Sequence, residues 1–467
     1  MHHKLKDFIM QHPKKILCVL LLVISYFLCQ CCTPKYNQPL LQPLIKPKPD
    51  TTTIVQDSQM LFATTFSGGG SRAMAMGWFV CEALSNIKYS DKTNLMQEID
   101  ISSGVSGGSF VSAALPIYRN NWKEFYTNGV VTDIQGAIIK RILMPWNWPK
   151  LLSRYYTRTD LASEYYDKYI FKNHTFGSVP PYPQLFINAT LLAQGTHFVY
   201  NDEYFRYIGS DIDSYPLGYA CAASSAVPIG FISMTLKNYG NTLSYDSLLN
   251  DRKYKRADRN RVDDINLYVY YRLRNFLNNK DNGWLHNQDG GLAGNTGIKR
   301  ILDECKTNGV INKAINNVNN PLKRIVILVV DAGTAKDDPS CEKQAPPLSL
   351  KVIMYTMTTA MDILSSERLA EVKAYMDQVW QTAQQSQRGL GFNDKALAQL
   401  EKPYVIEISA RNIMEMNLAN RFNNLPTSFH MNKAQLITIK EAVSHLLQNN
   451  KEYKRLVKAI KDEQLSE

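Results

Sequence analysis

The sequence predicts a three-layer α/β fold, in which a mainly parallel sheet carries helices on both faces. Three observations lead to this class. An apolar segment at residues 60–66 feeds a helical pattern through a glycine-rich turn, and a second strand that begins near Ile101 does the same. Apolar runs at 324–331 and 404–409 have the length and composition of buried strands. Because a helical pattern at 348–384 separates these runs, strands continue late into the chain, and we expect one large domain rather than two.

The composition indicates a folded chain with a preference for anionic partners. Of the 467 residues, 45% are hydrophobic and 20% are charged, which excludes a disordered or collagen-like protein. Lys and Arg outnumber Asp and Glu by 53 to 42, which gives a net charge of +11. Such a charge favours membrane surfaces, phospholipid head groups or nucleic acid, and charge alone does not choose among them.

Residues 1–32 have the layout of an export signal. A basic leader precedes an apolar run at 16–28, which is shorter than the roughly 20 residues that a membrane-spanning helix needs. The run is followed by three cysteines: Cys29, Cys31 and Cys32. This cluster resembles the cleavage site of bacterial lipoproteins, because Leu28 lies three residues before Cys31. The resemblance implies that Cys31 anchors an exported protein to a membrane of the cell envelope. Gln30 replaces the usual small residue, so the other two cysteines, a plain cleaved signal and an uncleaved anchor stay open.

The rest of the chain divides into two parts. Residues 33–58 hold five prolines among lysines and glutamines without an apolar period, which predicts a semi-rigid tether. Residues 59–467 form the expected folded domain, which ends in an amphipathic helical pattern at 433–459. Four widely spaced cysteines of this domain match no zinc pattern, and the sequence leaves open whether they are free thiols or disulfides: Cys81, Cys221, Cys305 and Cys341.

The first glycine turn predicts an anion-binding loop. It reads Ser67-Gly68-Gly69-Gly70-Ser71-Arg72. Glycines allow a sharp turn and leave amide groups uncovered at a helix start, where the helix dipole favours negative charge. The spacing also fits a loose dinucleotide fingerprint, but that motif needs a second strand that ends in an acid. Here Asp100 precedes the second strand, which disfavours a nucleotide site.

The second glycine turn has the G-x-S-x-G pattern of a nucleophile elbow. It reads Gly104-Val105-Ser106-Gly107-Gly108. Such a bend holds a serine at its tip between small neighbours, so that an incoming ester fits beside the strained backbone. Ser106 is therefore the candidate nucleophile.

A serine hydroxyl needs a base to take its proton, and Asp289 is the best-placed acid. Gly290 and Gly291 follow it directly, and they leave space beside it and allow a tight turn. None of the histidines lies in a motif typical of a catalytic base. His430 and His445, which follow Asp289 in the chain, stay open as third members of a triad.

The three motifs, in this order, resemble those of the patatin-like phospholipases, which are lipid acyl hydrolases with a Ser/Asp dyad and no catalytic histidine. Further stretches agree with that family: 188–190, 223–228, 291–297 and 425–429. The resemblance spans residue 60 to the C-terminal region. Gly294 stands where the family is expected to have an acid, a departure that does not touch the dyad.

The resemblance implies a role for each motif. Ser106 would be the nucleophile and Asp289 the general base. The oxyanion hole would come from three amides: Gly68, Gly69 and Gly70. Arg72 would fix this loop or face the lipid phosphate. The turns would be supported by four glycines: Gly104, Gly108, Gly290 and Gly291.

The implied reaction is hydrolysis of a carboxylic ester of a phospholipid or lysophospholipid at a membrane surface. It proceeds through an acyl-enzyme, and it needs no metal, no cofactor and no nucleic acid. Two alternatives stay open: an α/β-hydrolase-type esterase with a Ser-Asp-His triad, and a catalytically silent lipoprotein that binds lipid.

Two further segments bear on the substrate. Residues 144–152 place two tryptophans among apolar and basic residues, which is typical of a membrane interface but also of a packed connection over the site. The basic stretch at 252–261 predicts a solvated loop or a head-group contact.

Overall fold

The computed structural model describes residues 35–40, 55–56, 59–228, 230–240, 281–305, 309–334, 349–385 and 393–465. The export signal, the three leader cysteines and the basic stretch at 252–261 lie outside these residues. The described strands are β1 (Gln38–Pro39), β2 (Met60–Phe66), β3 (Ile101–Val105), β4 (Gln184–Leu191), β5 (Thr196–Tyr200), β6 (Ser210–Asp211), β7 (Met234–Lys237), β8 (Trp284–Asp289), β9 (Arg324–Asp331) and β10 (Tyr404–Ser409).

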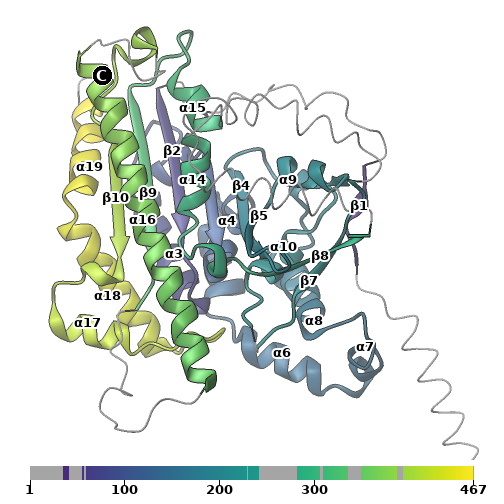
Figure 1. Ribbon diagram of the computed structural model, residues 1–467. Coiled ribbons are helices and arrows are strands. Elements are labelled where there is room, and N and C mark those ends of the chain that lie inside the picture. Colours follow the sequence, from purple (N-terminus) through teal and green to yellow (C-terminus); the bar gives the residue numbers. More distant parts are fainter. Residues whose placement is uncertain are drawn as a thin grey trace, which may run out of the picture.

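Helices connect and cover these strands (Figure 1). The described α-helices are α3 (Gly70–Ser85), α4 (Gly107–Tyr118), α5 (Trp122–Phe125), α6 (Ile134–Leu143), α7 (Trp148–Leu151), α8 (Arg158–Tyr165), α9 (Asp202–Tyr207), α10 (Leu217–Ser224), α14 (Ile298–Cys305), α15 (Val310–Ile315), α16 (Ser349–Gln385), α17 (Met416–Asn423), α18 (Lys433–Asn449) and α19 (Lys451–Gln464). Short 3-10 or π turns are η1 (Leu95–Glu98), η2 (Tyr126–Val130), η3 (Pro145–Asn147), η4 (Tyr166–Ile170), η5 (Phe176–Ser178), η7 (Gly290–Ala293), η9 (Asp394–Leu397) and η10 (Ala410–Asn412).

Within the described residues the main sheet has eight strands in the order β10-β9-β2-β3-β4-β8-β7, with β5 also paired to β4. The neighbours from β10 to β4 run parallel, so their carboxyl ends meet at one edge of the sheet. The strands β5, β7 and β8 pair antiparallel. The prediction of a mainly parallel sheet is confirmed, and the antiparallel part is an addition that the sequence patterns did not indicate.

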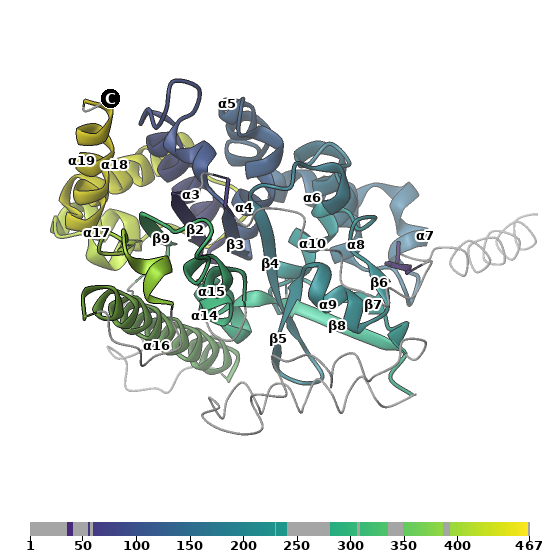
Figure 2. The same cartoon turned by 90° about the horizontal axis from the view of Figure 1, so that it is seen from above.

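The strand β9 shows why the molecule has three layers. Successive strand side chains point to opposite faces, and Val326, Leu328 and Val330 pack into one core, whereas Ile325, Ile327 and Val329 pack into the other. Figure 2 shows α14, α15 and α16 on one side of the sheet and α3, α4 and α18 on the other. A strand with two buried faces needs a continuous apolar run, which is the pattern that predicted it.

Two segments differ from their predictions. The terminal helical pattern is two helices, because Asn450 interrupts it: its side chain accepts the Tyr453 N–H and donates to the Glu407 carbonyl. Part of the expected tether belongs to the folded body, because β1 pairs antiparallel with β6 and the buried Asn37 side chain donates to Ser210 Oγ and the Lys237 carbonyl. In the part of the chain that the structure describes, no helix has the length and hydropathy to cross a membrane.

Candidate active site

The last residues of β3 and of β8 both pair with the strand β4. Val105, the last residue of β3, is in register with Asn188 of β4. Asp289, the last residue of β8, is in register with Ala189, the next residue along. Ser106 follows Val105 directly, so the sheet itself brings the predicted serine and the predicted acid together from 183 positions apart in the chain.

Ser106 has the strained backbone of a nucleophile elbow. Its φ of 49° and ψ of −122° lie where side chains other than glycine are rarely found. The surroundings hold this conformation: the Ser106 N–H donates to Ser224 Oγ at 2.8 Å, and that hydroxyl donates to the Asn188 carbonyl at 2.6 Å. Strain that is held by specific hydrogen bonds is typical of catalytic residues.

Glycines allow the elbow and the first loop to pack backbone against backbone. A Cβ atom on Gly107 would lie 2.0 Å from the Gly70 carbonyl oxygen, and one on Gly108 would lie 2.4 Å from the Phe66 oxygen. Any side chain at Gly107 would therefore push apart the starts of α3 and α4. Gly104 is equally confined, since its Cβ would lie 2.6 Å from Ser109 Cα. The sequence motif indicated a supporting role for Gly104 and Gly108, but it indicated no role for Gly107.

The first glycine loop supplies two free amides rather than three. The Gly68 N–H donates to the Asn295 carbonyl at 2.8 Å, so the predicted role of Gly68 as an oxyanion donor is wrong for this conformation. Gly68 instead lies against the nucleophile, because a Cβ on it would be 3.2 Å from Ser106 Cβ. Gly69 and Gly70 have φ of 137° and 60°, and within the described ranges their amides meet no acceptor. Both lie at the start of α3, where the helix dipole favours an anion.

Asp289 is buried, and only one of its two carboxylate oxygens accepts a hydrogen bond from the described residues. Oδ1 accepts the Gly291 N–H at 2.8 Å, which the tight turn after the acid makes possible. Oδ2 has no hydrogen-bond partner among the described residues. Burial raises the pKa of Asp289 to about 6, although the Gly291 amide and the neighbouring Ser106 hydroxyl act to lower it. Gly290 must be small, because a Cβ there would lie 2.2 Å from the Asn188 oxygen.

Arg72 braces the glycine loop from inside the protein. Its guanidinium donates to the carbonyls of Ala332 and Leu425, both at 3.0 Å. The side chain is buried, and burial lowers its pKa to about 10. Of the two roles that the sequence left open, these contacts fit the one that fixes the loop. A contact between Arg72 and a lipid phosphate does not fit this burial.

The histidines with resolved partners are engaged away from the acid. His430 Nδ1 lies 3.5 Å from Asp133 Oδ1, and His445 Nδ1 lies 3.4 Å from Asn449 Nδ2. His197 lies 2.9 Å from Asn188 Oδ1, and burial lowers its pKa to about 3. Within the described residues, no hydrogen bond or ion pair joins a histidine ring to Asp289 or Ser106. The geometry therefore offers no third member for a triad.

Other stretches that resembled the family surround the same point, although the sequence assigned them no role. Asn188 fixes the end of β3 by donating to the Gly104 carbonyl at 2.8 Å. The Ser428 carbonyl accepts the Ser71 N–H at 2.7 Å, at the start of α3. Asn295 holds Gly68, as described above. These residues were visible only as parts of quoted stretches, because their roles are contacts between distant segments.

No group of three or more His, Cys, Asp or Glu side chains that could hold a metal occurs among the residues the structure describes. Three of the four domain cysteines, Cys81, Cys221 and Cys305, are free and buried, and Cys341 lies outside the described residues.

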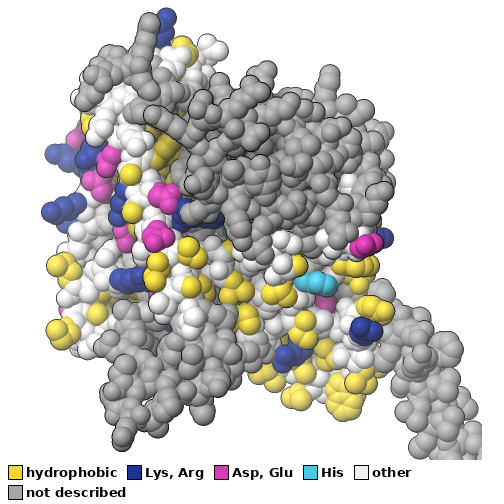
Figure 3. All heavy atoms as spheres, viewed as in Figure 1, with side chains coloured by type: hydrophobic (Ala, Val, Ile, Leu, Met, Phe, Trp, Pro, Cys, Tyr) yellow, Lys and Arg dark blue, Asp and Glu magenta, His cyan; other side chains and the backbone are white. Residues whose placement is uncertain are grey.

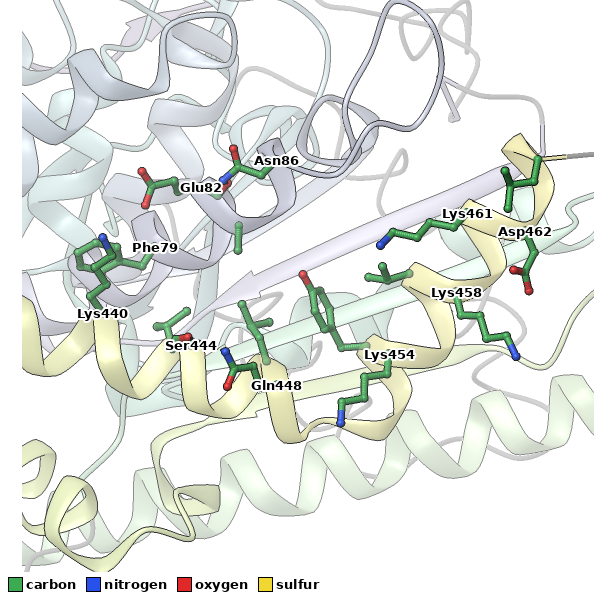
Figure 4. Close-up of a pocket in the computed structure, with 16 residues that line it drawn as sticks. Phe79, Glu82, Asn86, Lys440, Ser444, Gln448, Lys454, Lys458, Lys461 and Asp462 are labelled. Atoms are coloured by element: carbon green, nitrogen blue, oxygen red, sulfur yellow. Dashed lines mark hydrogen bonds between the residues drawn. The ribbon is translucent and has the colours of Figure 1, made fainter. Parts of the chain in front are cut away.

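A separate groove of about 680 Å³ lies between α3 and the terminal helices α18 and α19 (Figure 4). It is lined by apolar residues such as Phe79 and Leu447 and by several lysines, including Lys454 and Lys458. None of the predicted site residues lines it. We therefore place the candidate active site at the β4 junction, where the strained serine and the buried acid meet, and not in this groove.

Comparison with known proteins identifies one family. The family model described as patatin-like phospholipase matches residues 64–302, about half of the chain. The matched range contains both glycine turns and Asp289. No curated protein matches the chain.

Proposed function

Because the chain belongs to the patatin-like phospholipase family, we propose that it hydrolyses carboxylic esters of membrane phospholipids or lysophospholipids with a Ser106/Asp289 dyad. The observation that carries this proposal is the register of β4, where the strand ends that bear the two residues pair with consecutive positions. The amides of Gly69 and Gly70 beside this junction, which meet no acceptor in the described part of the chain, add the third part that acyl transfer requires.

The raised pKa of Asp289 suits a general base. A carboxylate with a pKa of about 6 is ionised at neutral pH and is still a stronger base than an ordinary aspartate. Asp289 would take the hydroxyl proton as Ser106 Oγ attacks the ester carbonyl, and it would return that proton to the leaving alcohol. In the second half, Asp289 would take a proton from the water that attacks the acyl-enzyme, and it would give that proton to Ser106 Oγ as the bond to the acyl group breaks and the fatty acid leaves.

The negative charge that forms on the carbonyl oxygen would be stabilised by the Gly69 and Gly70 amides. They start the 16-residue helix α3, whose dipole adds positive potential at this end. The donors are held before the reaction by the buried Arg72 and by the packing of Gly70 on Gly107. Loss of one such donor typically costs about 10² to 10³ in rate.

The predicted lipid anchor would locate this activity at a membrane. We infer that the protein is exported and lipid-anchored to a membrane of the cell envelope, with Cys31 as the attachment residue. The support is the order of basic leader, apolar run and cysteine cluster in the sequence.

Covalent labelling tests the dyad. A fluorophosphonate probe is expected to label the wild-type protein at Ser106 and to leave Ser106→Ala unlabelled. Asp289→Asn is expected to fold but to hydrolyse vesicle phospholipid at less than about 1% of the wild-type rate, as removal of a general base commonly does. Lipids from vesicles incubated with wild-type and Ser106→Ala protein, separated by mass spectrometry, would identify the ester that is cleaved.

Histidine variants are the matched control. His430→Gln and His445→Gln are expected to keep most of the activity, since neither ring contacts the dyad. Loss of activity in either variant would favour the triad esterase. An unlabelled, inactive wild-type protein that still binds lipid would favour the silent lipoprotein.

A further inference from the structure

An apolar patch lies exposed on α6, η3 and α7. Trp146 is 69% exposed and Leu152 is 74% exposed. Other large apolar side chains of the patch are also exposed: Ile139, Leu143, Trp148 and Tyr155. Of the two alternatives that the sequence left open for these tryptophans, the packed connection over the site does not fit this exposure. In Figure 3, apolar side chains gather at the lower right, where Figure 1 places α6 and α7.

The patch is built as one unit rather than as a loose loop. The Trp148 indole N–H donates to the Ile142 carbonyl at 3.1 Å, and the Asn147 amide donates to the Arg141 carbonyl at 2.7 Å. These bonds tie α7 and η3 to the end of α6. Exposed apolar side chains on a segment that is held by such bonds present a surface for an apolar partner.

The charged side chains around the patch indicate what kind of partner it binds. Residues 134–158 contain five basic residues and no acidic residue. Lys140 and Arg154 are exposed, and in the described structure they pair with no carboxylate. Tryptophans beside lysines and arginines match the boundary between acyl chains and anionic head groups, where indole rings and basic side chains are both favourable.

The N-terminal segment is held on the same side of the molecule. Lys35 Nζ lies 5.8 Å from the centre of the Tyr219 ring, and Lys150 of α7 lies 5.2 Å from the centre of the Tyr156 ring. Tyr219 belongs to α10, which packs on α8, and α8 packs on α6, so the chain at Lys35 and the patch lie on the same side of the molecule.

This position limits the distance between the protein and an anchored lipid. Lys35 is four positions after Cys31, and four extended residues span at most about 14 Å. A lipid on Cys31 would thus lie within that distance of Lys35. The pairing of β1 with β6 fixes the protein end of this span.

The patch also lies near the candidate active site. α6 begins beside the loop that contacts the start of α3, because the Gln135 N–H donates to the Phe429 carbonyl at 3.2 Å. The arrows of β2, β9 and β10 in Figure 1 point toward the end of the molecule where α6 lies. A membrane against the patch would therefore face the carboxyl edge of the sheet, where Ser106 follows β3.

We propose that α6, η3 and α7 form a docking surface for an anionic lipid bilayer, and that β1 fixes the lipid-anchored protein in this orientation. The inference rests on the proposed action on membrane lipids, because docking there would bring the dyad to its substrate. The binding itself does not require catalysis, so the two can be tested apart.

The binding test uses full-length protein that carries Ser106→Ala, so that the vesicles stay intact. Vesicles of phosphatidylglycerol and brominated phosphatidylcholine are expected to quench its tryptophan fluorescence, because bromine quenches only indoles that reach the acyl chains. Replacing both Trp146 and Trp148 by Phe is expected to remove most of that quenching. Equal quenching with and without these two replacements would overturn the proposal.

A matched pair of leucine variants tests the consequence for the active protein. Leu152→Ser is expected to lower the ratio of vesicle-lipid hydrolysis to soluble short-chain ester hydrolysis roughly tenfold, since it removes a membrane-buried side chain. Leu465→Ser, 87% exposed beside the C-terminus at the opposite end in Figure 1, is expected to leave the ratio unchanged. An unchanged ratio in Leu152→Ser overturns the docking surface alone. A wild-type protein that cleaves neither substrate refutes the proposed function, while the quenching test still stands.

A separate variant tests whether β1 orients the protein on the membrane. Asn37→Ala removes the side chain that binds Ser210 and Lys237, so it is expected to release β1 and lower the quenching while the protein stays on the vesicles. Undiminished quenching in this variant would refute the orienting role of β1.

Discussion

Replacing the buried acid by its neutral isostere should make the protein more stable and inactive at the same time. Burial raises the pKa of Asp289 from 3.8 to about 6, so the folded protein holds this proton more tightly than the unfolded chain does. At 1.36 kcal/mol per pKa unit, keeping the charged form buried costs about 3 kcal/mol above pH 7. Asp289→Asn removes the charge and keeps an oxygen to accept the Gly291 N–H.

The sign of the pH dependence follows from the raised pKa. The wild-type protein loses stability as the pH rises from about 4 to about 6, because the unfolded carboxylate ionises first. Asp289→Asn does not share this loss. We therefore expect the variant to exceed the wild-type free energy of unfolding by up to about 3 kcal/mol at pH 8 and by about half of that at pH 5.

Urea unfolding followed by circular dichroism at pH 5 and pH 8 measures both differences, provided that the slopes against urea agree between the proteins. Ser106→Ala is the control, since it removes the reactive hydroxyl but keeps the buried charge. If Asp289→Asn were no more stable than the wild type at pH 8, or if its advantage did not change with pH, Asp289 would not be a desolvated carboxylate. The physical basis for its role as a base would then be lost.

Three further outcomes are expected. The rate constant kcat/KM on a soluble ester should rise through about pH 6, as Asp289 loses its proton, and a profile that is flat from pH 5 to 8 would contradict this. Gly107→Ala should lose at least about tenfold in activity and about 1–3 kcal/mol in stability, because its Cβ would lie 2.0 Å from the Gly70 oxygen. Gly283→Ala, with nothing within 4 Å of its Cβ, should match the wild type in both assays. Arg72→Met should cost about 2–4 kcal/mol in thermal or urea unfolding, since it leaves two buried carbonyls without donors, and Arg72→Lys should not restore this loss.

The serine bend and the turn after the acid could be predicted because each depends on residues within a few positions in the sequence. A serine at a strand-to-helix bend needs small neighbours within two residues, so Gly104 and Gly108 identify Ser106 from the sequence. The strand β9 begins and ends where its apolar run does, since both of its faces are buried. The turn after Asp289 is equally local, because the Gly291 amide binds the acid two residues away.

The parts that were missed or wrong depend on contacts between distant segments. The Gly68 amide is taken by Asn295, 227 positions away, so no pattern near Gly68 reveals that it is occupied. β1 was predicted as tether because a two-residue strand has no periodicity, and only its pairing with β6 attaches it to the body. The sequence also left open whether Trp146 is exposed. An apolar segment has the same sequence pattern whether its side chains are buried or exposed to solvent.

By itself, the sequence determined the α/β class, the strained serine, the acid with its glycine turn and the family to which these motifs belong. Each is encoded within a few neighbouring residues, where backbone geometry and side-chain size act directly. Only the tertiary structure decided that β3 and β8 end at consecutive residues of β4, that two loop amides meet no acceptor among the described residues, and that Trp146 and Trp148 face outward. These depend on strand register and on burial, which arise from packing between segments far apart in the chain.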